Sequence, residues 1–247
     1  MKLISSSDNA RFKQWKSLLT SKGLKKEQLC IVSGKKLILE ILEQNLKRCQ
    51  TLLFSKNQML NDSFEQFDLE RMGLDTPLFK ELDELGTHQP LLIFDFSNLI
   101  LPWNSSEPSE ELEVFCPLGD PANLGALLRS CEAFGVKKVI LLKESAHPFL
   151  PKSLRASSGS ALRIPLCWGP AISELNFPLI GLDMEGTPLD QCPWPHPTRL
   201  LLGEEGLGLP RHLPSMTTVR IPMQGSVESL NAATAASIIL YEWQRRR

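Results

Sequence analysis

The sequence predicts an α/β protein with two domains. Three observations support this fold class. Stretches typical of strands and helices alternate along both halves of the chain, a Ser-, Pro- and acid-rich stretch separates them, and 247 residues at 42% hydrophobic suffice for two cores. The separating stretch, LPWNSSEPSEE at residues 101–111, lacks any periodicity. We place the boundary near residue 106, which gives domains of residues 1–106 and 107–247.

The N-terminal half is predicted to form a small α/β domain. Apolar residues at helical spacing predict its helices, and short apolar runs bounded by turn residues predict its strands. The expected elements are a helix over 8–22, a strand over 29–32, a helix over 36–44, a strand over 51–55, a helix over 76–85 and a strand over 91–96.

The C-terminal half shows the same alternation, which predicts a mostly parallel sheet with ligands at the carboxyl ends of its strands. The expected elements are a strand over 112–117, a helix over 123–134, a strand over 138–142, strands over 178–182 and 199–202, and a closing helix over 229–245.

Composition and residue spacing argue against several classes of protein. The chain has no uncharged apolar run of 18 or more residues, and its start, MKLISSSDNARFKQWK, is polar and charged. We therefore expect a cytoplasmic protein that does not span a membrane. The six cysteines include no CxxC pair and the four histidines no HExxH motif, so we expect buried thiols and no metal site.

Charge is distributed unevenly, although the net charge is only −1. Residues 1–50 contain 11 Lys or Arg and 4 Asp or Glu, residues 51–120 contain 3 and 14, and residues 121–247 contain 13 and 10. A basic N-terminal region is typical of a surface that contacts RNA phosphates, but a solvated helix face gives the same count. RNA is therefore a candidate partner.

Three polar, glycine-bearing segments follow predicted strands of the second domain. The motifs GxGxxG, GxxxxGK[ST] and GxSxG do not occur, which argues against ordinary dinucleotide, P-loop and hydrolase sites. The segments are DPANLGALLRSCEAFGV at 120–136, LLGEEGLGLP at 201–210 and IPMQGSVESLNAATAASIILYE at 221–242.

The order and spacing of these segments resemble the three motifs of the SpoU/TrmH class of RNA ribose 2'-O-methyltransferases in the SPOUT superfamily. In the first, NxGxxxRxxxxFG is matched by Asn123, Gly125, Arg129, Phe134 and Gly135. In the second, GxExxG is matched by Gly203, Glu205 and Gly208. In the third, IPM, SLN and a closing YE are matched by Ile221, Pro222, Met223, Ser229, Leu230, Asn231, Tyr241 and Glu242.

The resemblance implies a C-terminal domain with a deep trefoil knot, S-adenosylmethionine as cofactor, RNA as substrate, and a homodimer whose active site lies against the neighbouring subunit. It implies that the cofactor is held near Gly203, Ile221, Leu230, Leu202 and Met223. It also implies a catalytic shell formed by Arg129, Asn123, Glu205, Ser229 and Asn231. Taken singly, Asn123 and Ser229 are also explained as helix caps, and the glycines as turn residues.

Among the residues of that shell, Arg129 is the strongest candidate for a direct role. Methyl transfer to a ribose hydroxyl mainly requires orientation of the two reactants and stabilisation of the oxygen as its proton leaves. A guanidinium stays protonated in proteins, so we expect Arg129 to hold a phosphate and stabilise negative charge and not to act as a base. Glu205 is expected to position either Arg129 or Asn123.

The N-terminal half is similar to the ribosomal-protein-like α/β domain with which many members of the class bind substrate. The match is in ISSSDNARFKQWKSL and IVSGKKLILEIL, and Ser33 departs from the acidic residue usual before Gly34. The sequence distinguishes neither tRNA from rRNA nor the target nucleotide. Two alternatives stay open: a catalytically silent RNA-binding relative, and a methyltransferase with a non-RNA substrate.

Overall fold

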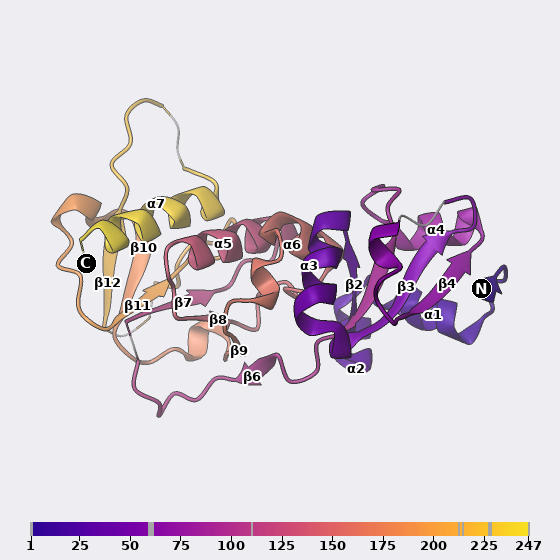
Figure 1. The fold of residues 1–247 in the computed structure, drawn as a ribbon. Coiled ribbons are helices and arrows are strands. Elements are labelled where there is room, and N and C mark those ends of the chain that lie inside the picture. The colour runs from indigo at the N-terminus through magenta and orange to yellow at the C-terminus, as the bar shows by residue number, and fades with distance from the viewer. Residues whose placement is uncertain are drawn as a thin grey trace. The chain divides into compact units, whose positions relative to one another are not determined.

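The computed structural model describes residues 2–58, 62–109, 111–211, 213, 215–226 and 229–246. The chain divides into two compact units, each built around one sheet (Figure 1). The first unit comprises Met1–Asn98 and Phe149–Arg155, and the second comprises Leu99–Pro148 and Ala156–Arg247. None of the helices in these described ranges is long and apolar enough to cross a membrane.

The first unit contains a five-stranded mixed sheet in the order β1-β4-β3-β5-β2. β1, β4 and β3 run parallel, and β5 is antiparallel to β3 and β2. The strands are β1 (Lys2–Ile4), β2 (Leu29–Ser33), β3 (Cys49–Ser55), β4 (Glu70–Leu74) and β5 (Leu91–Asp95). The helices are α1 (Ala10–Ser17), α2 (Ser21–Glu27), α3 (Lys35–Asn45) and α4 (Thr76–Leu82). The short strands β1 and β4 were not predicted.

The single helix predicted over residues 8–22 is wrong, because α1 and α2 are separate helices joined by a tight turn. The side chain of Asn9 caps α1, and the hydroxyl of Thr20 accepts a hydrogen bond from the Gly23 amide at 3.1 Å to begin α2. A Cβ atom on Gly23 would lie 1.9 Å from the Ser17 carbonyl oxygen. Only glycine permits this approach, and the turn therefore depends on it.

The core of the first unit forms where the apolar faces of its helices meet the sheet. Phe12 and Trp15 of α1 and Ile38 and Leu42 of α3 are buried. The segment Phe149–Arg155 completes this unit, and Phe149 packs its ring 4.6 Å from that of Phe96. Most of the helix α6 (Pro151–Ser157) therefore belongs to the first unit.

The second unit contains a seven-stranded sheet in the order β12-β10-β11-β7-β8-β9-β6. Each strand pairing described in it is parallel, as the alternation of elements predicted. The strands are β6 (Ile100–Pro102), β7 (Leu112–Cys116), β8 (Lys138–Leu141), β9 (Leu166–Trp168), β10 (Leu179–Pro188), β11 (Thr198–Leu201) and β12 (Met216–Arg220), and the helices are α5 (Pro121–Ala133) and α7 (Ala232–Arg245). β6, β9 and β12 were not predicted, and β10 is longer than expected.

The core of the second unit is apolar, with one buried ion pair. Phe115, Ile140 and Leu201 belong to a buried apolar cluster in this unit. The side chain of Arg199 donates from Nε to Oε2 of the buried Glu113 at 3.1 Å. On one face of the sheet α5 packs along α7 (Figure 1), and the hydroxyls of Ser130 and Ser237 lie 2.7 Å apart.

The closing helix begins later than predicted. The sequence suggested a start at Ser229, but α7 begins at Ala232. The side-chain oxygen of Asn231 accepts hydrogen bonds from the amides of Ala233 and Thr234 at 2.9 and 3.2 Å. Asn231 is therefore the N-cap, which leaves Ser229 outside the helix.

Candidate functional site

The three motif segments meet at one edge of the larger sheet. They follow the carboxyl ends of β7, β11 and β12, which are parallel strands of the same sheet. Carboxyl ends of parallel strands lie at the same edge, so loops far apart in the sequence approach one another there. Hydrogen bonds between their side chains show that these segments are in contact.

The first motif segment enters α5 through a strong helix start. Asp120 is the N-cap, and its carboxylate oxygen accepts hydrogen bonds from the amides of Ala122 and Asn123 at 2.9 and 2.8 Å. Pro121 occupies the first turn, where its fixed φ angle suits a helix and its missing N–H costs nothing. The cap fixes the position of Asn123 relative to the end of β7.

Glu205 joins the second motif segment to the first. Its Oε1 accepts a hydrogen bond from Nδ2 of Asn123 at 2.6 Å, and its Oε2 accepts one from the amide of Asp120 at 2.8 Å. Both carboxylate oxygens are thus occupied by groups at the start of α5. Of the two partners that the sequence left open for Glu205, the structure shows Asn123.

Asn231 joins the third motif segment to the first. While its Oδ1 caps α7, its Nδ2 donates to Oδ1 of Asn123 at 2.8 Å. Asn123 therefore donates to Glu205 and accepts from Asn231. Together, the three side chains form a continuous chain of hydrogen bonds, which we call the Glu205–Asn123–Asn231 chain.

The loop after β11 folds back on itself. Glu204 and Gly208 exchange two backbone hydrogen bonds, each 2.9 Å long. A Cβ atom on Gly203 would lie 2.8 Å from the carbonyl carbon of Gly208. Any side chain at residue 203 would open the loop, so glycine is required for this backbone arrangement.

The remaining residues expected near a cofactor differ in exposure. Leu202 is buried, Ile221 and Leu230 are half-buried, and Met223 is 39% exposed. Leu207, at the tip of the loop after β11, is 81% exposed. The edge thus presents apolar side chains beside the polar Glu205–Asn123–Asn231 chain.

Arg129 and Ser229 do not take part in the Glu205–Asn123–Asn231 chain. Both are exposed, and no residue in the described part of the structure forms a hydrogen bond or ion pair with Arg129. Arg129 lies six residues after Asn123 in α5, about 9 Å along the helix axis at 1.5 Å per residue. Its guanidinium is therefore available to a ligand.

Asp120 was missed as a site residue by the sequence reasoning. The signal was present, because an Asp-Pro pair before a helical pattern is typical of an N-cap followed by a first-turn proline. Its importance depends on the contact with Glu205, which is 85 residues away in the sequence.

The cysteines do not contribute a nucleophile to this edge. Cys116 lies at the end of β7, and burial raises the pKa of its thiol to about 11. Five of the six cysteines are buried and Cys167 is half-buried, which confirms the prediction of unpaired interior thiols. Across the described ranges, no group of three or more His, Cys, Asp or Glu is arranged to hold a metal ion.

A parallel sheet whose motif loops meet at one edge in this way has the architecture of the SPOUT class of RNA methyltransferases. The model of the SpoU rRNA Methylase family matches residues 114–241. The chain is 30% identical to the 23S rRNA (uridine(2479)-2'-O)-methyltransferase of Streptomyces viridochromogenes, over 98% of this chain and 91% of that protein. The chain belongs to the SpoU rRNA methylase family.

Two further relatives agree with this assignment. Ribosomal RNA small subunit methyltransferase G 2 of Syntrophobacter fumaroxidans is 39% identical over 98% of this chain, which spans about half (49%) of that protein's length. The SpoU methyltransferase AviRb from Streptomyces viridochromogenes, solved in complex with the cofactor AdoMet, has a TM-score of 0.79 at 26% identity, covering 97% of this chain and 98% of that one.

The two roles of Asn231 can be separated by mutation. We expect Asn231→Ala to lower the free energy of unfolding by about 1 kcal/mol, because it removes the cap of α7. Asn231→Ser keeps a capping oxygen but, like Asn231→Ala, has no amide to donate to Asn123, so the difference between the two variants isolates the cap and should be about 1 kcal/mol. Urea denaturation followed by circular dichroism measures both. Equal losses in the two variants would contradict the capping role.

Proposed function

We propose that this chain transfers a methyl group from S-adenosylmethionine to a ribose 2'-hydroxyl of ribosomal or transfer RNA in the cytoplasm. The Glu205–Asn123–Asn231 chain carries the proposal, because it joins all three motif segments. The 2'-O-methyltransferase relative supports the reaction type. A catalytically silent relative would be expected to lack some of these polar residues, yet they are present together with Arg129.

The residues at this edge fit the cofactor. The tight loop at Gly203 exposes backbone groups that can approach a ligand closely, and Leu202, Ile221, Leu230 and Met223 offer apolar contacts for an adenine ring. When bound, the cofactor supplies an activated methyl group on a sulfonium. These residues hold and orient it, and the knot implied by the resemblance would enclose it.

Orientation of the substrate is the main task left to the side chains. The guanidinium of Arg129 has a fork of N–H donors with no partner among the described residues, so it holds a phosphate next to the target ribose and stabilises the 2'-oxygen as its proton passes to water. The Glu205–Asn123–Asn231 chain keeps the surrounding loops in place. Ser229, exposed just before the cap of α7, completes the polar shell.

A homodimer would bring Arg129 to a second subunit's site. Along α7, Thr234, Ile238, Tyr241 and Arg245 are exposed at helical spacing and form one face. Ile238 is 37% exposed and Tyr241 55%, and the Tyr241 ring packs 6.1 Å from that of Phe134 on α5. A twofold interface can cover this apolar patch because the same surface meets itself.

Contact with the RNA backbone is proposed for the first unit. Lys13, Lys16 and Lys26 are exposed but pair with Asp8, Glu81 and Glu27, respectively. In the described structure no acid pairs with Lys22, Lys35 or Lys36. Among the basic residues of the N-terminal region, these three lysines are therefore better candidates for phosphate contacts than the three that pair with acids.

The experiment that tests the function compares 2'-O-methyl positions in total RNA from cells with and without the gene. We expect one position to lose its methyl group and to regain it with purified protein and S-adenosylmethionine. An unchanged map, together with no transfer to RNA from the deleted cells, would contradict the proposal.

With that RNA, we expect Arg129→Ala to slow methyl transfer by roughly 100-fold or more, the loss typical for removal of one group that stabilises a transition state. Arg129→Lys should recover only part of the rate, because lysine keeps the charge but not the planar fork. Cofactor affinity, measured by calorimetry, should change little. Turnover at the wild-type rate by the alanine variant would contradict a role of Arg129 in methyl transfer.

Charge reversal of the unpaired lysines should weaken RNA binding by lowering the number of phosphate contacts. For Lys22→Glu, Lys35→Glu and Lys36→Glu combined, the slope of log affinity against log salt should fall by about 2 to 3. The matched control is Lys13→Glu, Lys16→Glu and Lys26→Glu, which alters lysines already paired with acids. Identical slopes for the two triple variants would contradict this assignment.

Disruption of the exposed face of α7 tests the dimer. We expect Ile238→Asp with Tyr241→Asp to produce a monomer in analytical ultracentrifugation and to abolish methyl transfer, because a charged patch cannot meet itself. Leu101→Asp, at an equally exposed apolar position on β6, is the matched control and should leave both properties unchanged. A fully active monomer would refute the requirement.

A further inference from the structure

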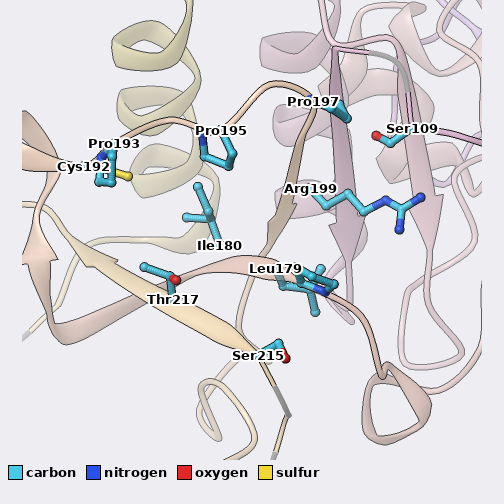
Figure 2. Close-up of a pocket in the computed structure, with 11 residues that line it drawn as sticks. Ser109, Leu179, Ile180, Cys192, Pro193, Pro195, Pro197, Arg199, Ser215 and Thr217 are labelled. Atoms are coloured by element: carbon cyan, nitrogen blue, oxygen red, sulfur yellow. The ribbon is translucent and has the colours of Figure 1, made fainter.

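A cavity of about 530 Å³ lies at the amino ends of β10, β11 and β12 (Figure 2). Leu179 begins β10, and Arg199 and Thr217 are the second residues of β11 and β12. Because these strands are parallel, their amino ends lie at the edge of the sheet opposite the motif loops. The cavity is therefore separate from the candidate methyl-transfer site.

The walls of the cavity are apolar and stiff. Its volume falls within the range of small-molecule pockets. Proline fixes the backbone angle φ, and the hydroxyl of Thr198 donates to the Pro195 carbonyl while accepting from Nε1 of Trp243 at 3.3 Å. The loop that carries three of the prolines is thus anchored to α7. The apolar lining consists of Pro178, Leu179, Ile180, Pro193, Pro195 and Pro197.

Arg199 presents a fixed donor group at one end of the cavity (Figure 2). Its Nε is held by Glu113, and its guanidinium carbon lies 4.8 Å from the centre of the Phe177 ring. The side chain is only 17% exposed. No acceptor for its two terminal nitrogens is found in the described part of the chain. A planar fork of N–H groups is therefore left for a ligand.

The charges around Arg199 favour an anionic ligand. The carboxylate of Glu113 lies between two cations, with Oε2 bonded to Arg199 and Oε1 3.9 Å from Nζ of Lys138. The other acid at Lys138 is Glu107, which is 57% exposed and 3.4 Å away. Among the described residues that line the cavity, Arg199 is the one that carries a charge, and that charge is positive.

Ser109 supplies a second polar group that lacks a hydrogen-bond partner in the described structure. Ser109 lines the cavity, and its hydroxyl oxygen is buried with no hydrogen-bond partner among the residues the structure describes. Buried hydroxyls in folded proteins almost always have partners, so this hydroxyl can turn to an acceptor on a ligand in the cavity. Ser215 and Thr217 add further hydroxyls to the lining.

We propose that this cavity binds a small organic anion, with an apolar ring or chain against the prolines and a carboxylate or phosphate against Arg199 and Ser109. The proposal does not depend on methyl transfer, because the cavity and the motif loops lie at opposite edges of the sheet. Failure of one proposal therefore leaves the other standing.

The test uses the full chain with labelled isoleucine methyl groups and three probes: phenyl phosphate, benzoate and the neutral benzyl alcohol. We expect saturable shifts of the Ile180 methyl signal with one or both anions, and no shift of Ile221 at the other edge. Whichever of the two anions binds more tightly shows whether the cavity prefers a phosphate or a carboxylate. No saturable shift of Ile180 at ~10 mM anion, or equal binding of benzyl alcohol, would overturn the proposal.

Variants of the lining residues then test which side chains contact the anion. Arg199→Lys keeps a cation beside Glu113 but loses the fork, and should weaken the tighter anion at least tenfold. Thr217→Trp, at an exposed lining position, should block the cavity. Arg245→Lys, an ion-paired arginine outside the cavity, is the control and should bind as wild type. Unchanged affinity in both lining variants would show that the anion binds elsewhere.

Discussion

The arrangement of the candidate site depends on the direction of two hydrogen bonds at one carboxamide. Asn123 donates to Glu205 through Nδ2 and accepts from Asn231 through Oδ1. Neither neighbour can exchange roles, because both Glu205 oxygens already accept and the Asn231 oxygen already caps α7. The polarity of the chain is therefore fixed from both ends. This constraint fixes the positions of the three motif loops relative to one another.

Most longer elements were predictable because their apolar spacing is strong. α3, with Ile38, Ile41 and Leu42 on one face, and the fully buried β7 are examples. Of the strands that were missed, β1, β6 and β9 have three residues each, too few for any periodicity, while β4 and β12 have five. The break between α1 and α2 was missed since it depends on the approach of Gly23 to Ser17, which no local pattern records.

The sequence predicted which residues form the candidate site, but it did not predict which hydrogen bonds join them. The motif spacing identified Asn123, Glu205 and Asn231, and the structure brings all three together. Their pairing and the contact of Asp120 with Glu205 depend on tertiary structure, whereas the cap of α7 by Asn231 is a local contact. The cavity around Arg199 is formed by β10, β11, β12 and a proline-rich loop. No sequence motif predicted it.

The sequence distances within the Glu205–Asn123–Asn231 chain have a consequence for folding. Its two bonds join residues 82 and 108 positions apart. Closing such large loops is costly in entropy until the strands between them have paired, so contacts of this kind form late. The site is therefore not assembled before α7, whose cap Asn231 belongs to the chain of hydrogen bonds, has docked. The candidate site is thus complete only after all three motif strands have joined the sheet.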